Sequence, residues 1–142
     1  DAAAAHWPGR IAVRHGYDEP LAHLMQAGAD AIVIPSRTEP CGLTQMYGLR
    51  YGTIPVVRRT GGLADSVIDA SAHNLAHERA TGVVFNDMDA DALAWALERA
   101  IDLYHHKPLW HAMVRRAMHE DFSWRKSAAR YVALYRSIAR PE

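Results

Sequence analysis

The chain has little of what marks several large classes of protein, beginning with cysteine and net charge. It has 142 residues and a single cysteine, Cys41, so it cannot form an internal disulfide, which fits a reducing compartment. Acidic and basic residues balance at 16 each, and the basic residues are scattered along the chain. Such a chain has no general electrostatic means of gathering nucleic acid. We therefore expect a cytoplasmic protein that does not bind nucleic acid.

Long apolar runs and metal-binding motifs are also missing from the sequence. No run approaches the ~20 apolar residues that a membrane-spanning helix needs, so we expect no membrane partner. His73 and His77 are four residues apart with Glu78 beside them, but no HExxH motif is present. We interpret these histidines as surface residues. The sequence predicts no metal site and no bound cofactor.

Short apolar segments alternate with segments of helical pattern, and this order predicts the fold class. Strands are expected at 10–14, 31–34, 53–59 and 81–85. Helices are expected at 18–30, 42–52, 60–69, 87–104, 108–120 and 124–139. Alternation of this kind favours an α/β fold with part of a doubly wound, Rossmann-like parallel sheet.

The domain organisation follows from the same pattern. We expect one partial domain over residues 1–142, with carboxyl-terminal helices at 107–142. The chain does not start with methionine, and its first residues read as the inside of a helix that began earlier. The expectation is therefore a segment of a longer protein.

The helical half of the chain carries apolar residues that we assign to the core. On the helix at 87–104, one face holds Leu93, Leu97, Ile101 and Tyr104. Three tryptophans fall at helical positions among other apolar residues, namely Trp95, Trp110 and Trp124. Stacking on carbohydrate is an alternative for these rings, but core packing is the favoured interpretation.

The loop 35–44 follows the apolar strand at 31–34 and holds the most unusual residues. Ligands of open parallel sheets bind at the carboxyl ends of the strands, where this loop lies. Gly42 and Leu43 open a helix, so their N–H groups lack helical partners and suit a phosphate, with the Thr44 hydroxyl beside them. Glu39, just upstream, could bind sugar hydroxyls or stabilise a positively charged sugar ring. An ordinary loop acid and an ordinary turn explain these residues equally well.

Other residues at the same sheet edge are weaker candidates. The paired glycines of RTGGL (59–63) could let a ligand approach the backbone, although a plain turn explains them too. Tyr17 could stack on a base, or pack on its own helix. Cys41 as a nucleophile would need an oriented base, and nothing ties a histidine to it. We favour Cys41 as a small residue that lines a pocket.

The residues from Ala29 to Asp69, ADAIVIPSRTEPCGLTQMYGLRYGTIPVVRRTGGLADSVID, closely resemble a known family. They are similar to the carboxyl-terminal domain of bacterial glycogen synthases and plant starch synthases of the ADP-glucose type. GYDEPLAHLMQAGAD before this block and DFSW after it fit the same family, so the resemblance covers nearly the whole chain.

The resemblance implies a two-domain GT-B fold and a retaining glucosyltransferase. Such enzymes move glucose from ADP-glucose to the non-reducing end of an α-1,4-glucan without a metal. Glu39 matches the acid of the EPCGL motif, which is catalytic and lies beside the donor glucose. The resemblance implies donor-binding roles for Gly16, Tyr17, Cys41, Gly42, Leu43 and Thr44. The amino-terminal domain and the basic residues that neutralise the diphosphate would lie before residue 1, so the segment alone should be inactive.

Two other functions remain open, and one residue departs from related families. The chain could belong to a GT-B transferase of another nucleotide sugar, or be a non-catalytic module that binds a nucleotide or a glucan. Many sugar-nucleotide transferases carry a second glutamate eight residues after the first, which holds the ribose. That position is Tyr47 here, so we assign no ribose ligand.

The partial sheet raises a question about the strand expected at 10–14. In a doubly wound sheet the strands that should separate 10–14 from 31–34 come first in the chain, and they are not in this sequence. We therefore expect 10–14 either to be detached from 31–34 or to pair differently, for example through a partner chain.

Overall fold

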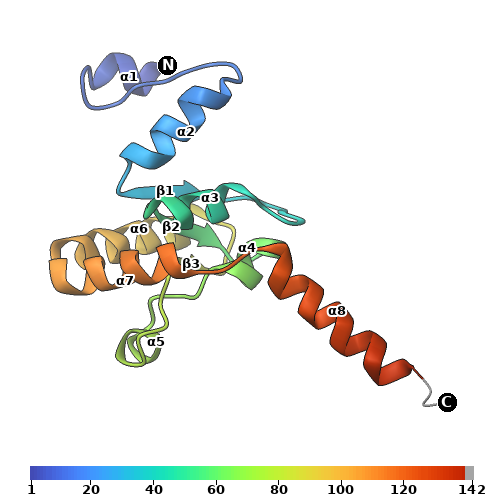
Figure 1. Ribbon diagram of the computed structural model, residues 1–142. Helices are drawn as coiled ribbons and strands as arrows, with labels where there is room; N and C mark the ends of the chain where they lie inside the picture. The colour runs from blue at the N-terminus through green and yellow to red at the C-terminus, as the bar shows by residue number, and fades with distance from the viewer. Residues whose placement is uncertain (140–142) are drawn as a thin grey trace.

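The computed structural model describes residues 1–139, which form a parallel sheet surrounded by helices (Figure 1). The strands are β1 (Ala31–Ile34), β2 (Ile54–Arg58) and β3 (Val83–Phe85), and they lie in the order β1-β2-β3. The helices are α1 (Ala2–His6), α2 (Glu19–Gly28), α3 (Thr44–Tyr51), α4 (Gly61–Ser66), α5 (Ala72–Ala76), α6 (Ala90–His105), α7 (Lys107–His119) and α8 (Trp124–Ile138). Both strand pairs are parallel, so the predicted α/β class and three of the four predicted strands are confirmed.

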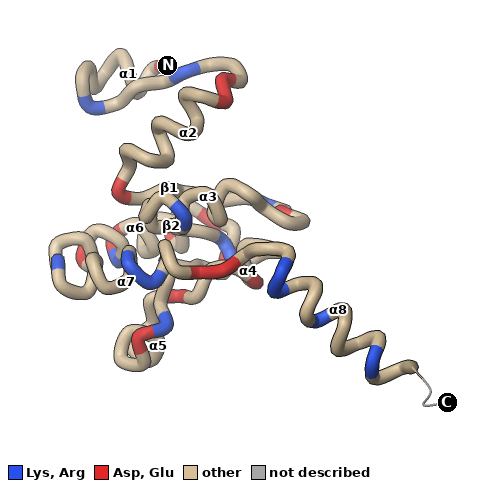
Figure 2. Tube along the Cα trace, viewed as in Figure 1, with Lys and Arg blue, Asp and Glu red and all other residues tan. Residues whose placement is uncertain are grey.

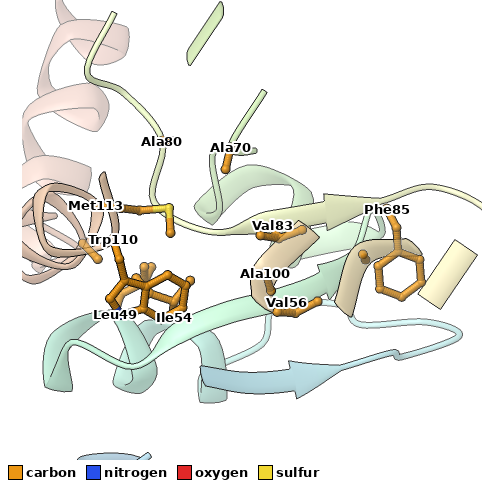
Figure 3. Close-up of a cluster of buried hydrophobic side chains, with 12 residues drawn as sticks. Leu49, Ile54, Val56, Ala70, Ala80, Val83, Phe85, Ala100, Trp110 and Met113 are labelled. Atoms are coloured by element: carbon orange, nitrogen blue, oxygen red, sulfur yellow. The ribbon is translucent and has the colours of Figure 1, made fainter. Parts of the chain in front are cut away.

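The central strands are apolar throughout because both faces of the sheet are covered. Successive side chains of a strand point to opposite faces, and Val56 and Val57 are both fully buried. Val57 packs with Leu63 of α4, whereas Val56 belongs to the larger core under α6 and α7. Figure 3 shows that larger core, including Leu49, Ile54, Val56, Ala70, Ala80, Val83, Phe85, Ala100, Trp110 and Met113.

Strand β1 differs from this pattern because it lies at an edge. Within residues 1–139 it pairs with β2 alone, and its other edge has no strand partner. Val33 in the middle of β1 is 42% exposed. The predicted position of this apolar strand is confirmed, but its open edge leaves it only partly buried.

The strand expected at 10–14 does not form. Residues 11–15 have no regular secondary structure, and Ile11 and Val13 are 40% and 45% exposed. A strand needs a neighbour to accept its hydrogen bonds, and no neighbour is present among the described residues. The expected detachment of this segment from 31–34 is confirmed. Figure 1 shows α1 and α2 projecting together from the β1 side of the sheet.

Helix α6 begins three residues later than predicted, and its buried face is rotated. The Asp89 side chain caps the helix by accepting from the N–H of Ala92 at 2.7 Å. Ala96 and Ala100 are buried, so the backbone of the helix approaches the sheet closely. The flanking residues Leu93, Leu97 and Tyr104 pack against the core as expected. Ile101 was placed wrongly, since it is 55% exposed.

The tryptophans and α8 show how much apolar surface stays open. Trp110 is buried as predicted, but Trp95 and Trp124 are 53% and 84% exposed, so the core assignment was wrong for both. Every described residue of α8 is exposed, and Figure 1 shows this helix projecting from the sheet. Acidic and basic residues are interspersed over most of the chain, whereas α8 carries basic residues only (Figure 2). Among residues 1–139, no helix combines the length and apolar composition needed to cross a membrane.

Asp69 and Arg99 tie β3 to α6 through hydrogen bonds and charge. The Asp69 carboxylate accepts from the N–H of Val84 at 2.8 Å and pairs with Arg99 at 3.3 Å. Arg99 also donates to the Ala70 carbonyl at 3.0 Å and lies 4.4 Å from the centre of the Trp95 ring. Trp95 is thus explained as a partner of Arg99 rather than as a core residue.

We predict that Asp69→Ala destabilises the protein, because it leaves the buried Val84 N–H without an acceptor and Arg99 without a counter-ion. The expected loss in the free energy of unfolding is about 1–3 kcal/mol. Urea unfolding followed by circular dichroism measures it. The exposed Asp65 of α4 is the control, and Asp65→Ala should change stability by less than about 0.5 kcal/mol. Equal losses in the two variants would contradict the prediction.

Candidate active site

The carboxyl ends of the three strands lie along one edge of the sheet because the strands are all parallel. Residues 35–43 form an irregular loop after β1, and residues 59–60 form a short turn between β2 and α4. The Gly62 N–H donates to the Glu39 carbonyl at 3.1 Å, so these two connections lie in direct contact. The structure therefore brings together the two segments, 35–44 and 59–63, that the sequence assigned to the ligand edge.

Glu39 lies half-buried in the middle of the loop 35–43. Its Oε2 accepts a hydrogen bond from the Ser36 hydroxyl at 3.2 Å. Within residues 1–139, Ser36 supplies the only hydrogen bond to this carboxylate, and Oε1 keeps its acceptor capacity. A carboxylate held in this way can accept hydrogen bonds from hydroxyl groups or stabilise a positive charge.

The paired glycines Gly61 and Gly62 fit closely against the backbone of the loop 35–43. A Cβ atom on Gly61 would lie 1.9 Å from the Glu39 carbonyl oxygen, and one on Gly62 would lie 1.8 Å from that of Cys41. Gly61 also has φ +43°, in the left-handed region that favours glycine. Admission of a ligand to the backbone was one of two interpretations of these glycines, beside a plain turn. In the structure they admit the neighbouring loop instead.

Gln45 holds the second half of the loop from inside the protein. This side chain is fully buried, and its Nε2 donates to the carbonyls of Cys41 at 3.3 Å and Gly42 at 2.9 Å. Nε2 also lies 3.0 Å from the hydroxyl of Ser66 on α4. Gly42 has φ +67°, and a Cβ there would lie 2.5 Å from Gln45 Oε1. Sequence patterns gave no sign of this role, because a glutamine in the first turn of a helix usually faces water.

Gly42, Leu43 and Thr44 lead into α3, which begins at Thr44, two residues later than predicted. Leu43 occupies the N-cap position, and no side-chain cap hydrogen bond is present there. The first N–H groups of α3 are therefore free of a side-chain acceptor and, with the helix dipole, suit an anion. Leu43 and Thr44 are exposed, so a ligand can reach this helix end. Binding by these three residues stays a prediction.

Cys41 is an exposed free thiol next to Gly42. No histidine in residues 1–139 is hydrogen-bonded to it, which gives no support to a nucleophilic role. No group of three or more metal-ligating side chains gathers within the described part of the chain. His73 and His77 lie with ring centres 4.2 Å apart, both exposed.

Gly16 and Tyr17 lie apart from the other predicted site residues. They precede α2, whose first turn is capped by the Asp18 side chain accepting from the N–H of Leu21 at 3.0 Å. Tyr17 is 88% exposed, so it does not pack on its own helix. Figure 1 shows the start of α2 clearly separated from the loop between β1 and α3. The structure therefore groups Glu39 with Cys41–Thr44 and leaves Gly16 and Tyr17 outside that group.

A groove of about 470 Å³ lies beside Leu43, between α3 and the connection from α7 to α8. Its lining comprises Leu43, Met46, Tyr47, Arg50, Glu120, Asp121, Phe122 and Ser123. Hydrogen bonds from the Ser123 hydroxyl and then from its N–H lower the pKa of Asp121, so this carboxyl stays charged. Sequence reasoning did not find this groove, because its two walls are more than 60 residues apart.

We predict that Gly62→Ala destabilises the protein by about 1–3 kcal/mol, because the new methyl group overlaps the Cys41 carbonyl and drives the two loops apart. Urea unfolding measures the loss, and hydrogen exchange at residues 39–43 reports the loosening. Gly28→Ala is the control, since a Cβ at Gly28 meets nothing within 4 Å. An undisturbed loop in Gly62→Ala would show that the contact is unimportant.

Comparisons with known proteins agree on one family. Residues 11–119 match the model described as "Glycosyl transferases group 1". Glycogen synthase of Mannheimia succiniciproducens is 56% identical over 92% of the chain, and glycogen synthase 1 of Rhizobium radiobacter is 57% identical over 96%. The chain spans about 28% of the length of each of these relatives.

A solved structure gives the same result for the fold. The catalytic domain of starch synthase IV from Arabidopsis thaliana, bound to ADP and acarbose, is 40% identical with a TM-score of 0.82. That match covers 98% of this chain and 29% of the starch synthase chain. The parallel sheet, the position of its helices and the sequence matches lead to the same conclusion: the chain belongs to the group 1 glycosyl transferases.

Proposed function

We propose that the chain is the donor-binding, carboxyl-terminal part of a retaining glucosyltransferase that moves glucose from ADP-glucose to an α-1,4-glucan. The observation that carries this proposal is Glu39, held by Ser36 in the loop that leads to the uncapped start of α3, in a chain more than half identical to glycogen synthases. The ADP and acarbose bound to the Arabidopsis starch synthase support a nucleotide donor and a glucan acceptor. A cytoplasmic location fits the single, reduced cysteine.

The chemistry of glycosyl transfer fits this arrangement. Positive charge develops on the donor sugar while negative charge develops on the departing diphosphate. The free N–H groups at Thr44 would face the diphosphate, and the Glu39 carboxylate would lie beside the glucose. Gly42 and Cys41 would line the pocket through their backbone. The proposal includes no metal, because basic side chains of the longer protein would complete the neutralisation of the diphosphate.

Exposed apolar surface supports the view that the chain is a partial domain. A groove of about 270 Å³ runs along the open edge of β1, where Val33, Ile101 and Tyr104 contribute to the lining. One stripe of α8 presents Trp124, Tyr131, Tyr135 and Ile138 to solvent. Surfaces of this kind mark places where other protein packs. The rest of the longer protein, including the amino-terminal GT-B domain, is the partner that we propose, and the segment alone would be inactive.

We predict that Glu39→Ala lowers kcat at least ~10²-fold in the longer protein, because it removes a preorganised charge that acts on the transition state. The affinity for the donor should change little. Turnover of labelled ADP-glucose with glycogen measures both quantities. The matched control is Glu98→Ala, which removes an exposed acid of α6.

The same assay separates the alternatives. Intact turnover in Glu39→Ala would favour a non-catalytic module that binds a nucleotide or a glucan. Faster turnover with UDP-glucose than with ADP-glucose would favour a GT-B transferase of another nucleotide sugar. Either result would overturn the proposed function.

We predict that Tyr17→Ala weakens ADP binding about tenfold, through loss of stacking on the adenine. This requires α2 to bring Gly16 and Tyr17 to the donor once the longer protein is assembled. Calorimetric titration of ADP into the longer protein measures the affinity. Tyr17→Phe keeps the ring and should bind normally. Unchanged affinity in Tyr17→Ala would remove Tyr17 from the site.

A further inference from the structure

Arg58, the last residue of β2, is half-buried and uses its guanidinium group to hold backbone carbonyls. Its Nε donates to the Ser36 carbonyl at 2.9 Å and its Nη2 to the Arg37 carbonyl at 2.5 Å. Its Nη1 donates to the Asn86 carbonyl at 3.4 Å, beyond the end of β3. One side chain thus joins the connections that leave β1 and β3.

Backbone hydrogen bonds of the sheet cannot hold the loop 35–43 where it leaves β1. The β1–β2 register ends with Ile34 opposite Val57, and the next residue on the β1 side is Pro35. Proline has no N–H, so the ladder of backbone hydrogen bonds cannot continue through it. Arg58 replaces the ladder with side-chain donors. A guanidinium suits this task because it carries several donors in a fixed plane, whereas a lysine ammonium is a point charge.

The residues held by Arg58 lead directly to Glu39. Ser36, whose carbonyl accepts from Arg58, donates its hydroxyl to Glu39 Oε2 at 3.2 Å. Arg58 therefore restrains the amino-terminal half of the loop, while Gly62 and Gln45 restrain the half from Glu39 to Gly42. A carboxylate on an irregular loop reaches a precise position only when both sides of that loop are restrained.

We propose that Arg58 is a positioning residue for Glu39, acting through Ser36, and not a ligand of the donor diphosphate. The proposal rests on the glucosyltransferase function given above. An arginine at the carboxyl end of a strand in such an enzyme invites assignment as a phosphate ligand. Three of its N–H groups, one on each nitrogen, face carbonyls instead, and those carbonyls compete directly with a phosphate for these N–H groups.

The test is a double-mutant cycle in the longer protein, with ADP-glucose as donor and glycogen as acceptor. Arg58→Ala should lower kcat about 10- to 100-fold, the cost of a small displacement of a reacting group. Arg58→Lys should not restore activity, because a single ammonium nitrogen cannot reach three carbonyls that the guanidinium contacts through three separate nitrogens. In a Glu39→Gln background, Arg58→Ala should lower the residual rate less than about twofold, because its effect passes through Glu39. The affinity for ADP, measured by calorimetry, should stay within about threefold in every variant.

Several results would overturn the proposal. Additive losses in the double variant would mean that Arg58 does not act through Glu39, and an ADP affinity weakened tenfold or more would indicate direct diphosphate contact. Normal kcat in both Arg58 variants, together with a loss in Glu39→Gln, would overturn the role of Arg58 alone. Full activity in Glu39→Gln would instead overturn the proposed function.

A control variant and a replacement variant separate a positioning role of Arg58 from general destabilisation of the protein. Arg79→Ala, at an exposed arginine after α5, should leave kcat and the melting temperature unchanged. If Arg58→Ala does not fold, the same cycle is run with Arg58→Lys. The interpretation stays the same. Non-additive losses of kcat in Arg58→Lys and Glu39→Gln support the positioning role, and additive losses overturn it.

Discussion

The close contact between the two strand-end connections is the constraint on which the candidate site depends. Gly61 and Gly62 have no side chains, so the backbone of Glu39–Cys41 rests directly on theirs. The hydrogen bond from the Gly62 N–H to the Glu39 carbonyl then fixes the acid at a defined distance from the start of α4. A side chain at either glycine would separate the loops by more than the length of that hydrogen bond permits. Backbone packing thus fixes one point of the loop at Glu39, and the side chains of Arg58 and Gln45 restrain the residues on either side.

The parallel sheet makes this contact possible, and its incompleteness explains the exposed surface. Parallel pairing puts the ends of β1 and β2 at the same edge, so the connections that follow them meet. Strand β2 has neighbours on both sides and both faces covered, and its residues are almost all buried. Strand β1 has one neighbour among the described residues, and Val33 and the nearby Ile101 stay open to solvent. One missing neighbour accounts for both the exposed strand and the exposed helix face.

The features that the sequence predicts well are those with a local pattern. The apolar runs at β2 and β3 each depend on a few consecutive residues. The resemblance singled out Glu39, and strand polarity placed it at the sheet edge. The strand predicted at 10–14 does not form, because strand formation depends on a partner strand that the described chain lacks. Trp95 was wrongly assigned to the core, because its ring packs on the charged Arg99 side chain and an apolar pattern does not reveal such a partner. Arg58 and Gln45 were missed because they bind carbonyl groups, whose positions depend on the assembled fold.

The charges around the loop also explain why this segment would form only part of an active site. One helix end offers roughly half a positive charge, which is less than a diphosphate needs for neutralisation. Arg58, the charged residue at the end of β2, directs its donors to three carbonyl groups. Under the proposed function, the described chain would position an acid and present N–H groups, and further cations would come from the rest of the longer protein. With the acid on this segment and the neutralising charges on the rest of the protein, turnover would depend on assembly. The acid and the charges would meet only when the remaining protein is in place.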